Sequence, residues 1–205
     1  LHDALPICIN KEFSVETKGG IVEAKIIQTS NNKAKLISIE MGKAIFKSKE
    51  IPTNFITNEV IGEQLEVNDK KYEINCVSIG NPHCVILKDE LKIDEIKKYG
   101  KIIEVDSHFP NKTNVQFAKV ISRNEAEILI WERGAGFTLA SGTSSCAVAS
   151  VLRKKNLIDN KVKIKMLGGE LLIQIDNDWN IKMTGEVRQI VEGVLSDELI
   201  EDLNK

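Results

Sequence analysis

The sequence has only four cysteines in 205 residues, and they are scattered along the chain. Cys8, Cys76, Cys84 and Cys146 form no Cys-x-x-Cys pair, which excludes a zinc ribbon and the dense cross-linking of a small disulfide scaffold. We therefore expect reduced thiols that are buried as small hydrophobic side chains, in a protein of the cytoplasm.

The sequence also lacks a surplus of either charge and any long apolar run. Lys and Arg number 28 and Asp and Glu number 30, so the net charge is −2. Without a basic excess to displace counterions from a polyanion, we predict no nucleic-acid partner. No apolar run approaches the ~18 residues of a transmembrane helix. No stretch has the pattern of a signal peptide, so the sequence predicts neither membrane insertion nor secretion.

The first seven residues, LHDALPI, resemble the translation of a sequencing-adapter oligonucleotide. We expect residues 1–7 to be non-native and the native reading frame to begin near Cys8. The alternative is a native disordered tail.

The hydrophobic pattern is that of many short strands and few helices, which indicates an α+β fold. Lys18-Gly19-Gly20 and Asn68-Asp69 each separate two alternating segments, as in hairpins. A helix is predicted over residues 93–99, and a core helix after Gly142 that Asn156 closes. The predicted strands cover residues 13–17, 21–29, 34–41, 64–67, 72–79, 83–88, 114–122, 125–132, 162–166, 171–176, 180–184 and 188–196.

Two turns place polar residues beside apolar strands. In Gly80-Asn81-Pro82-His83, the Asn81 side chain either caps its own backbone or is held toward a ligand. A metal bound by both His83 and Cys84 is disfavoured, because adjacent strand residues point to opposite faces. In the second turn, Pro110-Asn111, the chain leads to Asn114, which either orients a polar ligand or simply begins the next strand.

A third cluster runs from the end of one strand to the start of the core helix. Glu132 and Arg133 precede a Gly-x-Gly loop, and Ser141-Gly142-Thr143 opens the helix. Helix N-termini bind carboxylate or phosphate, and an adjacent arginine adds a bidentate carboxylate contact. The cluster lacks the lysine of a P-loop, so it does not predict nucleotide binding. The alternative is that Ser141 is only an N-cap and Glu132–Arg133 a surface pair.

Together and in this order, these segments resemble those of diaminopimelate epimerase, a racemase family that works without pyridoxal phosphate. The resemblance covers nearly the whole chain after about Cys8, and its most specific part is ERGAG at its distance from GNPH. It is carried by ETKGG, SIEMG, GNPHCV, FPNKTNVQF, WERGAGFTLASGT, MLGGELLIQI and MTGEV.

The resemblance implies two pseudo-symmetric α+β domains, each a mixed sheet curled around a central helix, with an amino-acid substrate in the cleft between them. It implies no cofactor and no metal, and a homodimer for the full-length protein. We expect residues 8–72 to be the remnant of an incomplete N-terminal domain, 73–182 the C-terminal domain, and 183–205 a segment that returns to the N-terminal domain.

The resemblance also assigns roles to individual residues. The implied catalytic residues are Ser141, His83 and Glu132. Ser141 stands at the position of the family's second catalytic cysteine. For substrate binding, the resemblance implies that Asn81 and Asn114 hold the substrate. Glu132 and Arg133 would bind its distal amino-carboxyl end, and the amides of Gly142 and Thr143 would bind its α-carboxylate.

The sequence departs from the family pattern in two places. The family's first catalytic cysteine lies in a Cys-Gly-Asn-Gly segment, and no such segment occurs here, so we expect this chain alone to be inactive. Serine replaces the second catalytic cysteine at Ser141, and Phe137 replaces a usual glutamate. A hydroxyl is far less acidic than a thiol, whose reference pKa is ~8.5. The leading interpretation is therefore a diaminopimelate epimerase of the lysine and peptidoglycan pathway. The alternatives are a one-base isomerase, dehydratase or racemase of another amino acid with the same fold, and a non-catalytic amino-acid-binding paralogue.

Overall fold

The computed structural model describes residues 11–17, 20–31, 33–191 and 193–203. These residues form strands, α-helices and one short 3-10 helix, η2 (Ser48–Glu50). The helices are α1 (Ile93–Glu104), α2 (Gly142–Lys154) and α3 (Asp197–Leu203). The strands are β1 (Glu12–Thr17), β2 (Gly20–Ser30), β3 (Lys33–Lys43), β4 (Ile61–Val67), β5 (Lys70–Ser78), β6 (Pro82–Leu87), β7 (Asn114–Ser122), β8 (Glu125–Glu132), β9 (Gly136–Thr138), β10 (Lys161–Met166), β11 (Gly169–Ile175) and β12 (Asn180–Glu186).

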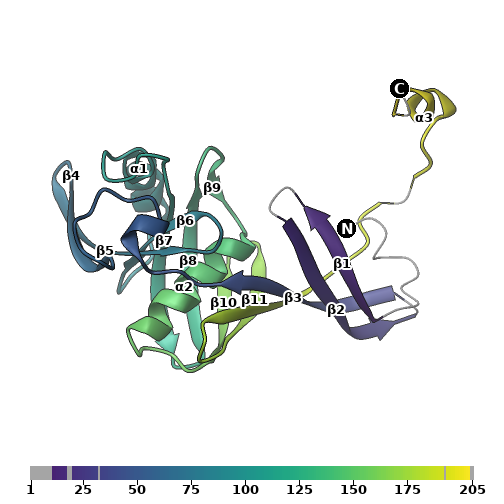
Figure 1. Cartoon of the computed structure of the whole chain (residues 1–205), viewed down its shortest axis with the longest axis horizontal. Helices are drawn as coiled ribbons and strands as arrows, with labels where there is room; N and C mark the ends of the chain where they lie inside the picture. Colours follow the sequence, from purple (N-terminus) through teal and green to yellow (C-terminus); the bar gives the residue numbers. More distant parts are fainter. Residues whose placement is uncertain (1–10, 18–19, 32, 192, 204–205) are drawn as a thin grey trace.

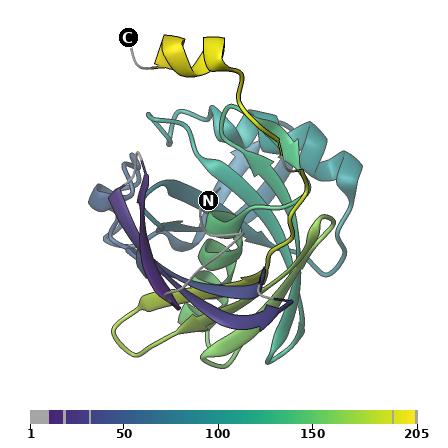
Figure 2. The same ribbon diagram turned by 90° about the vertical axis from the view of Figure 1, so that its right-hand side faces the viewer.

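The strands of the described residues belong to one mixed sheet that curves around α2 (Figures 1 and 2). Its order is β1-β2-β3-β12-β11-β10-β8-β7-β6-β5-β4, with β9 added beside β8. The pairs β6–β7 and β8–β10 are parallel, and the other pairs are antiparallel. The predicted α+β class, with a mixed sheet around a central helix, is confirmed.

Helix α2 is buried because its first turns are built from small residues. Residues 144–152 are all buried, so the sheet approaches the helix closely on several sides. Val148, Val151 and Leu152 are fully buried, and each such side chain stabilises the fold by about 1.5–3 kcal/mol. Asn156 ends the helix at a φ of 57°, while the N–H of Leu157 donates to the carbonyl of Leu152 at 2.9 Å. This confirms the predicted closure at Asn156.

Helix α1 is longer than its predicted range of 93–99 and continues to Glu104. Gly100 lies in its middle, where a Cβ atom would be only 2.8 Å from the Cβ of Trp131 in β8. The glycine therefore lets α1 lie against β8, and the packing of the buried Ile103 extends the helix past the point where the local pattern ends.

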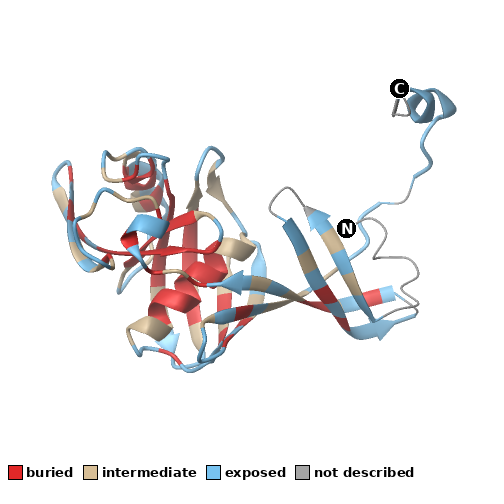
Figure 3. Ribbon diagram, in the orientation of Figure 1, coloured by how far each residue is buried: buried red, intermediate tan, exposed pale blue. Residues whose placement is uncertain are grey.

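The strands β1, β2 and β3 extend away from the body that surrounds α1 and α2 (Figure 1). They are joined to it by β12, which pairs with both β3 and β11. Only a small apolar cluster, with Ala24, Ile26, Ala34 and Ile37 as its buried members, lies among these three strands, and most of their surface is exposed (Figure 3). The predicted domain boundary after residue 72 falls inside β5, whose neighbours β4 and β6 both belong to the body. The domain assignment remains a prediction.

The prediction of a strand over residues 188–196 is wrong for the described residues of that segment. Val187 still donates to the Lys35 carbonyl at 3.0 Å, but residues 188–191 and 193–196 have no regular secondary structure, and α3 follows. Ile190 and Val194 are 95% and 99% exposed, so among the described residues no strand lies beside the apolar alternation that suggested one. No helix in the described part of the chain is both long and apolar enough to cross a membrane.

Candidate active site

The three polar segments found in the sequence meet at one edge of the sheet. Strands β6 and β7 run parallel with His83 opposite Asn114, so both begin at this edge. Strand β8 runs antiparallel to β7 with Trp131 opposite Val115, so it ends there. The topology thus brings together turns that are far apart along the chain.

The Asn114 side chain connects all three segments. Its Nδ2 donates to the Pro82 carbonyl at 2.8 Å, and its Oδ1 accepts from the backbone N–H of Arg133 at 3.0 Å. Asn114 is buried. Asn114 therefore both begins β7 and fixes the position of the loop that carries Glu132 and Arg133.

The loop after β8 turns sharply because two of its residues are glycines. Gly134 and Gly136 have φ of 79° and 80°, in the left-handed region that other residues rarely adopt. Glu104 at the end of α1 holds this loop, since its carboxylate accepts from the Gly134 N–H at 3.0 Å and from Trp131 Nε1 at 2.7 Å.

Glu132 and Arg133 make separate contacts. Glu132 Oε1 accepts from the Thr138 hydroxyl at 2.6 Å, and Arg133 Nη1 donates to the Asn111 carbonyl at 3.0 Å. Among the ion pairs of the described residues, Glu132 and Arg133 are not paired with each other, which argues against the alternative of a surface pair. Arg133 is exposed and Glu132 half-buried, so each keeps polar atoms for a ligand.

Ser141 is the N-cap of α2. Its Oγ accepts from the Ser144 N–H at 3.4 Å, and its carbonyl accepts from the Ser145 hydroxyl at 2.9 Å. The Ser141 N–H donates to the sulfur of Met166 at 3.4 Å, and Met183 lies against Gly142. The capping bond is thus observed, while a role of Ser141 beyond capping remains a prediction. The bond leaves the hydroxyl of Ser141, which is half-buried, as one of the polar groups at the helix start.

His83, in β6, is buried beneath the sheet edge and is not exposed at the candidate site. Its side chain is fully buried, and burial lowers the pKa of His83 to about 3. Nε2 lies 2.9 Å from Asn81 Oδ1, and Nδ1 lies 3.1 Å from Nε2 of Gln116. The imidazole is therefore neutral near pH 7 and linked to Asn81, the residue before Pro82 in the turn.

With this geometry in view, comparison with known proteins is decisive. Residues 75–190, more than half of the chain, match the family model described as diaminopimelate epimerase. The chain belongs to the diaminopimelate epimerase family.

Individual relatives agree with this family. The chain is 46% identical over 189 residues to diaminopimelate epimerase 2 of a Nostoc species, covering 92% of this chain and 65% of that relative. It is 38% identical over 193 residues to diaminopimelate epimerase of Alkaliphilus metalliredigens, covering 94% of this chain and 68% of that relative. The chain thus spans about two thirds of the length of these diaminopimelate epimerases.

A solved structure supports the fold. The crystal structure of a hydroxyproline epimerase from Agrobacterium vitis, with bound trans-4-hydroxy-L-proline, has a TM-score of 0.63 to this chain. The match covers 87% of this chain and 58% of that one at 11% sequence identity, so it shows the shared fold alone.

The cysteines of this diaminopimelate epimerase family member are structural where they are described. Cys76 and Cys84 face each other across β5 and β6, and both are fully buried, as is Cys146 in α2. Burial raises the pKa of Cys146 to about 12, and contact with Cys76 followed by burial raises the pKa of Cys84. The prediction of buried, free thiols is confirmed for these three. Cys8 lies outside the described residues.

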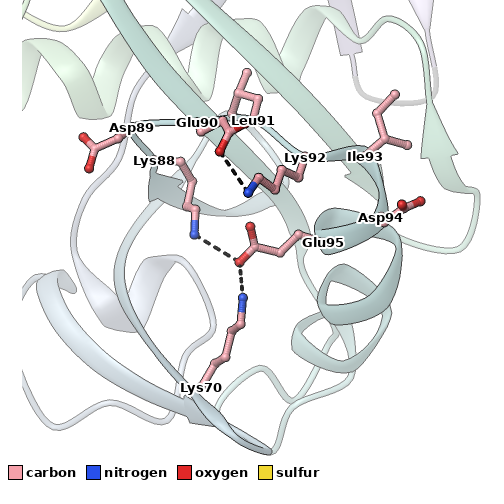
Figure 4. A pocket seen from close by; sticks show the side chains of 9 residues that line it. All are labelled: Lys70, Lys88, Asp89, Glu90, Leu91, Lys92, Ile93, Asp94 and Glu95. Atoms are coloured by element: carbon pink, nitrogen blue, oxygen red, sulfur yellow. Dashed lines mark hydrogen bonds and ion pairs between the residues drawn. The ribbon is translucent and has the colours of Figure 1, made fainter.

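A cavity of about 730 Å³ lies elsewhere, beside the start of α1. Glu95 is its central residue and accepts from Lys70 at 2.7 Å and Lys88 at 3.0 Å (Figure 4). The lining as a whole has three lysines and four carboxylates, so the cavity has no surplus of positive charge for an anion. Its remaining lining residues are Asp89, Glu90, Leu91, Lys92, Ile93 and Asp94.

Sequence reasoning did not identify four residues that organise the candidate site. Glu104 and Thr138 hold the loop of Glu132 and Arg133, and Gln116 and Ser144 lie behind His83. One signal was available, because Gln116 is two residues after Asn114 and so lies on the same face of β7. Glu104 gave no such signal, since only the packing of α1 on β8 brings it to the loop.

Proposed function

We propose that the protein containing this chain is a diaminopimelate epimerase that interconverts the LL and meso forms of diaminopimelate. The observation that carries this proposal is the meeting of the GNPH, PNKTN and ERGAG segments at one sheet edge beside the start of α2, in a chain of this family. The proposed reaction removes the α-proton as H⁺, leaves its electron pair on the substrate as an enolate-like carbanion, and returns a proton to the opposite face.

The start of α2 suits the α-carboxylate of such a substrate. The amides of Gly142 and Thr143 lie in the first turn of a 13-residue helix, where unpaired N–H groups and the helix dipole favour negative charge. Enolate-like charge develops next to this carboxylate as the α-proton leaves, so the same amides stabilise the transition state more than the ground state.

Glu132 and Arg133 suit the distal end, which carries one ammonium and one carboxylate. Among the described residues, Nη1 of Arg133 donates to the Asn111 carbonyl and its other guanidinium N–H groups have no partner, so the guanidinium keeps further N–H donors for a carboxylate. Glu132 uses Oε1 for Thr138 and keeps Oε2 for an ammonium group. Asn81 and Asn114 remain the proposed contacts to the middle of the substrate.

Binding specificity tests this assignment. We expect meso-diaminopimelate to bind at least about tenfold more tightly than lysine. Lysine lacks the distal carboxylate and so cannot make the charge-assisted contact with Arg133, which is worth about 1.5–3 kcal/mol. Arg133→Gln should remove the preference, while Arg188→Gln, an exposed arginine paired with Glu186, should keep it. Equal affinity for lysine and diaminopimelate in isothermal titration would contradict the proposed substrate.

Ser141 favours a second candidate, a one-base isomerase, dehydratase or racemase of the same fold that acts on another amino acid. Serine is a poor proton donor to a carbanion because its hydroxyl is much less acidic than a thiol. On diaminopimelate, such an enzyme would exchange the α-proton or eliminate a leaving group without inverting the α-carbon.

The cytoplasmic location expected from the cysteines and the homodimer that the family resemblance implies for the full-length protein belong to this proposal as well. Size-exclusion chromatography with light scattering tests the dimer, which predicts twice the chain mass in solution.

A further inference from the structure

Gln116 in β7 is a fully buried amide that touches two other elements. Its Nε2 lies 3.1 Å from Nδ1 of His83 in β6 and 3.0 Å from the Ser144 hydroxyl in α2. Its Oε1 has no hydrogen-bond partner in the part of the chain that the structure describes. None of the substrate or catalytic roles discussed above falls on Gln116.

The direction of these hydrogen bonds follows from the two ends of the amide. An NH₂ group carries two donors, and the observed arrangement gives each of them an acceptor. The reversed amide would leave two buried donors unbonded instead of one carbonyl oxygen, and buried donors without a partner are the rarer and costlier case. Gln116 therefore donates to His83 Nδ1.

This donation determines which nitrogen of His83 carries the proton. A nitrogen that accepts a hydrogen bond has a free lone pair, so Nδ1 is unprotonated and Nε2 holds the hydrogen of the neutral ring. Nε2 then donates to Asn81 Oδ1 at 2.9 Å. Gln116 thus donates both to Ser144 at the start of α2 and to His83, and His83 donates in turn to Asn81 in the turn before β6.

We propose that Gln116 is a positioning residue that holds His83 as the Nε2-protonated tautomer, and that His83 in turn fixes the Asn81 oxygen so that the Asn81 N–H groups are left for an acceptor atom of the substrate. The tautomer rests on the hydrogen bonds alone. The role of Asn81 toward substrate rests on the proposed function. Burial of the ring, which keeps it neutral, agrees with this arrangement.

Long-range ¹H–¹⁵N correlation NMR of the imidazole nitrogens tests the tautomer in this chain. We expect His83 to show an unprotonated Nδ1 and a protonated Nε2. His108 is the internal reference, because its Nδ1 lies 2.7 Å from Asp106 Oδ1 and should be the protonated nitrogen. A protonated Nδ1 on His83 in the unmodified chain would overturn the proposal without any variant.

Gln116→Met keeps the length of the side chain and removes both donors. Methionine fills a similar volume in this buried position, so we expect the chain to stay folded, as judged by its circular dichroism, although the bonds from Gln116 to His83 and Ser144 are lost. We expect His83 to lose its single tautomer and show averaged nitrogen shifts, while Gln116→Asn serves as a second variant that keeps the amide but is too short to reach. Unchanged His83 shifts in folded Gln116→Met would overturn the proposal.

The effect on substrate is measured in the protein expressed from the complete gene. Gln116→Met should raise the KM for diaminopimelate about five- to tenfold, the loss of one oriented hydrogen bond, and should add nothing in an Asn81→Ala background. An unchanged KM, or a full effect in the Asn81→Ala background, would overturn the positioning role while the proposed function stands. If the unmodified protein binds no diaminopimelate but shows the expected tautomer, the proposed function fails with the role of Asn81, and the assignment of His83 is upheld.

Discussion

The side-chain oxygen of Asn114 accepts a hydrogen bond from the backbone N–H of Arg133 at 3.0 Å. Through this contact the first residue of β7 fixes the loop that presents Glu132 and Arg133. The same side chain donates to the Pro82 carbonyl, so one buried amide holds three segments at the sheet edge. A residue proposed to contact substrate is therefore also a structural residue.

Asn114→Asp should destabilise the chain although it keeps the acceptor for Arg133. The variant places a carboxylate against the Pro82 carbonyl, where the amide donated a hydrogen bond, and leaves that carbonyl unbonded. We expect the free energy of unfolding in urea to fall by about 1–3 kcal/mol. Asn111→Ala is the matched control, because the exposed Asn111 side chain has no hydrogen bond within the described part of the chain and only its backbone carbonyl accepts one there, so this variant should unfold like the parent chain. Equal stability of Asn114→Asp and the parent would contradict the role given to Asn114.

Glu95 should give the chain a stability that is lost in acid. Burial alone would raise its pKa, but hydrogen bonds from Lys70, Lys88 and Tyr72 outweigh burial and lower the pKa of Glu95 to about 2. A carboxyl whose pKa is lower when folded stabilises the chain above its ordinary pKa of 4.5. That stabilisation disappears as the pH falls from about 4.5 toward 2.

We expect Glu95→Gln to lower the free energy of unfolding by about 2–3 kcal/mol at pH 7, because the side chain is only 9% exposed and its loss leaves two lysines without their partner. Denaturant titrations between pH 7 and pH 3 should show the difference between variant and parent shrinking as the pH falls. Glu66→Gln, which breaks the exposed pair with Lys71, should change nothing measurable. A difference that stays constant across this range would show that Glu95 does not act through its charge.

Gly100→Ala should destabilise the chain although alanine favours helices. The new Cβ would lie 2.8 Å from Cβ and 2.9 Å from Cγ of Trp131, so α1 or β8 must shift. We expect this overpacking, about 1–3 kcal/mol, to exceed the helix preference of about 1 kcal/mol. Thermal unfolding followed by tryptophan fluorescence measures the result, with Lys101→Ala at the next, exposed helix position as the control. A stabilised Gly100→Ala would show that α1 does not lie as close to Trp131 as described.

Much of this fold could be predicted from the sequence because local patterns agree with the tertiary contacts. The local sequence correctly predicts the β4–β5 hairpin turn at Asn68 and the end of α2 at Asn156, where both residues have a positive φ. It also predicts the buried helix α2 from its small residues. The predictions of secondary structure are wrong where contacts with distant elements, rather than the local sequence, determine the structure. Residues 188–196 have the alternation of a strand, but the described part of this segment pairs with no described strand. Helix α1 continues past Gly100 because the glycine lets it pack against Trp131 of β8.

The candidate site divides in the same way. Turns and a helix start predicted that Asn81, Asn114, Glu132, Arg133 and Ser141–Thr143 carry polar chemistry, and the topology brings them to one edge. The buried position of His83 was not predictable, because nothing local shows that Gln116 and α2 cover it. Glu104 could not be found either, since it reaches the loop only through the packing of α1.

Ser141 should show two separable effects, one on stability and one on rate. Ser141→Ala removes the cap on the Ser144 N–H and should cost about 1 kcal/mol, while Ser141→Asn keeps a capping oxygen and should cost less. If Ser141 also returns the proton, both variants should lose epimerisation, and Ser141→Cys should raise the rate, because a thiol at a helix N-terminus titrates nearer neutral pH. Unchanged rates in Ser141→Ala and Ser141→Cys would leave Ser141 as a cap alone.

Solvent deuterium exchange at the α-carbon tests the central claim most directly. The protein expressed from the complete gene is incubated in D₂O with LL-diaminopimelate, and NMR follows both the loss of the α-proton signal and the appearance of the meso form. The account predicts deuterium at the α-carbon of the inverted product. Exchange or elimination without inversion would favour the one-base enzyme instead. The absence of both exchange and inversion, with diaminopimelate still bound, would contradict an epimerase and leave a binding protein.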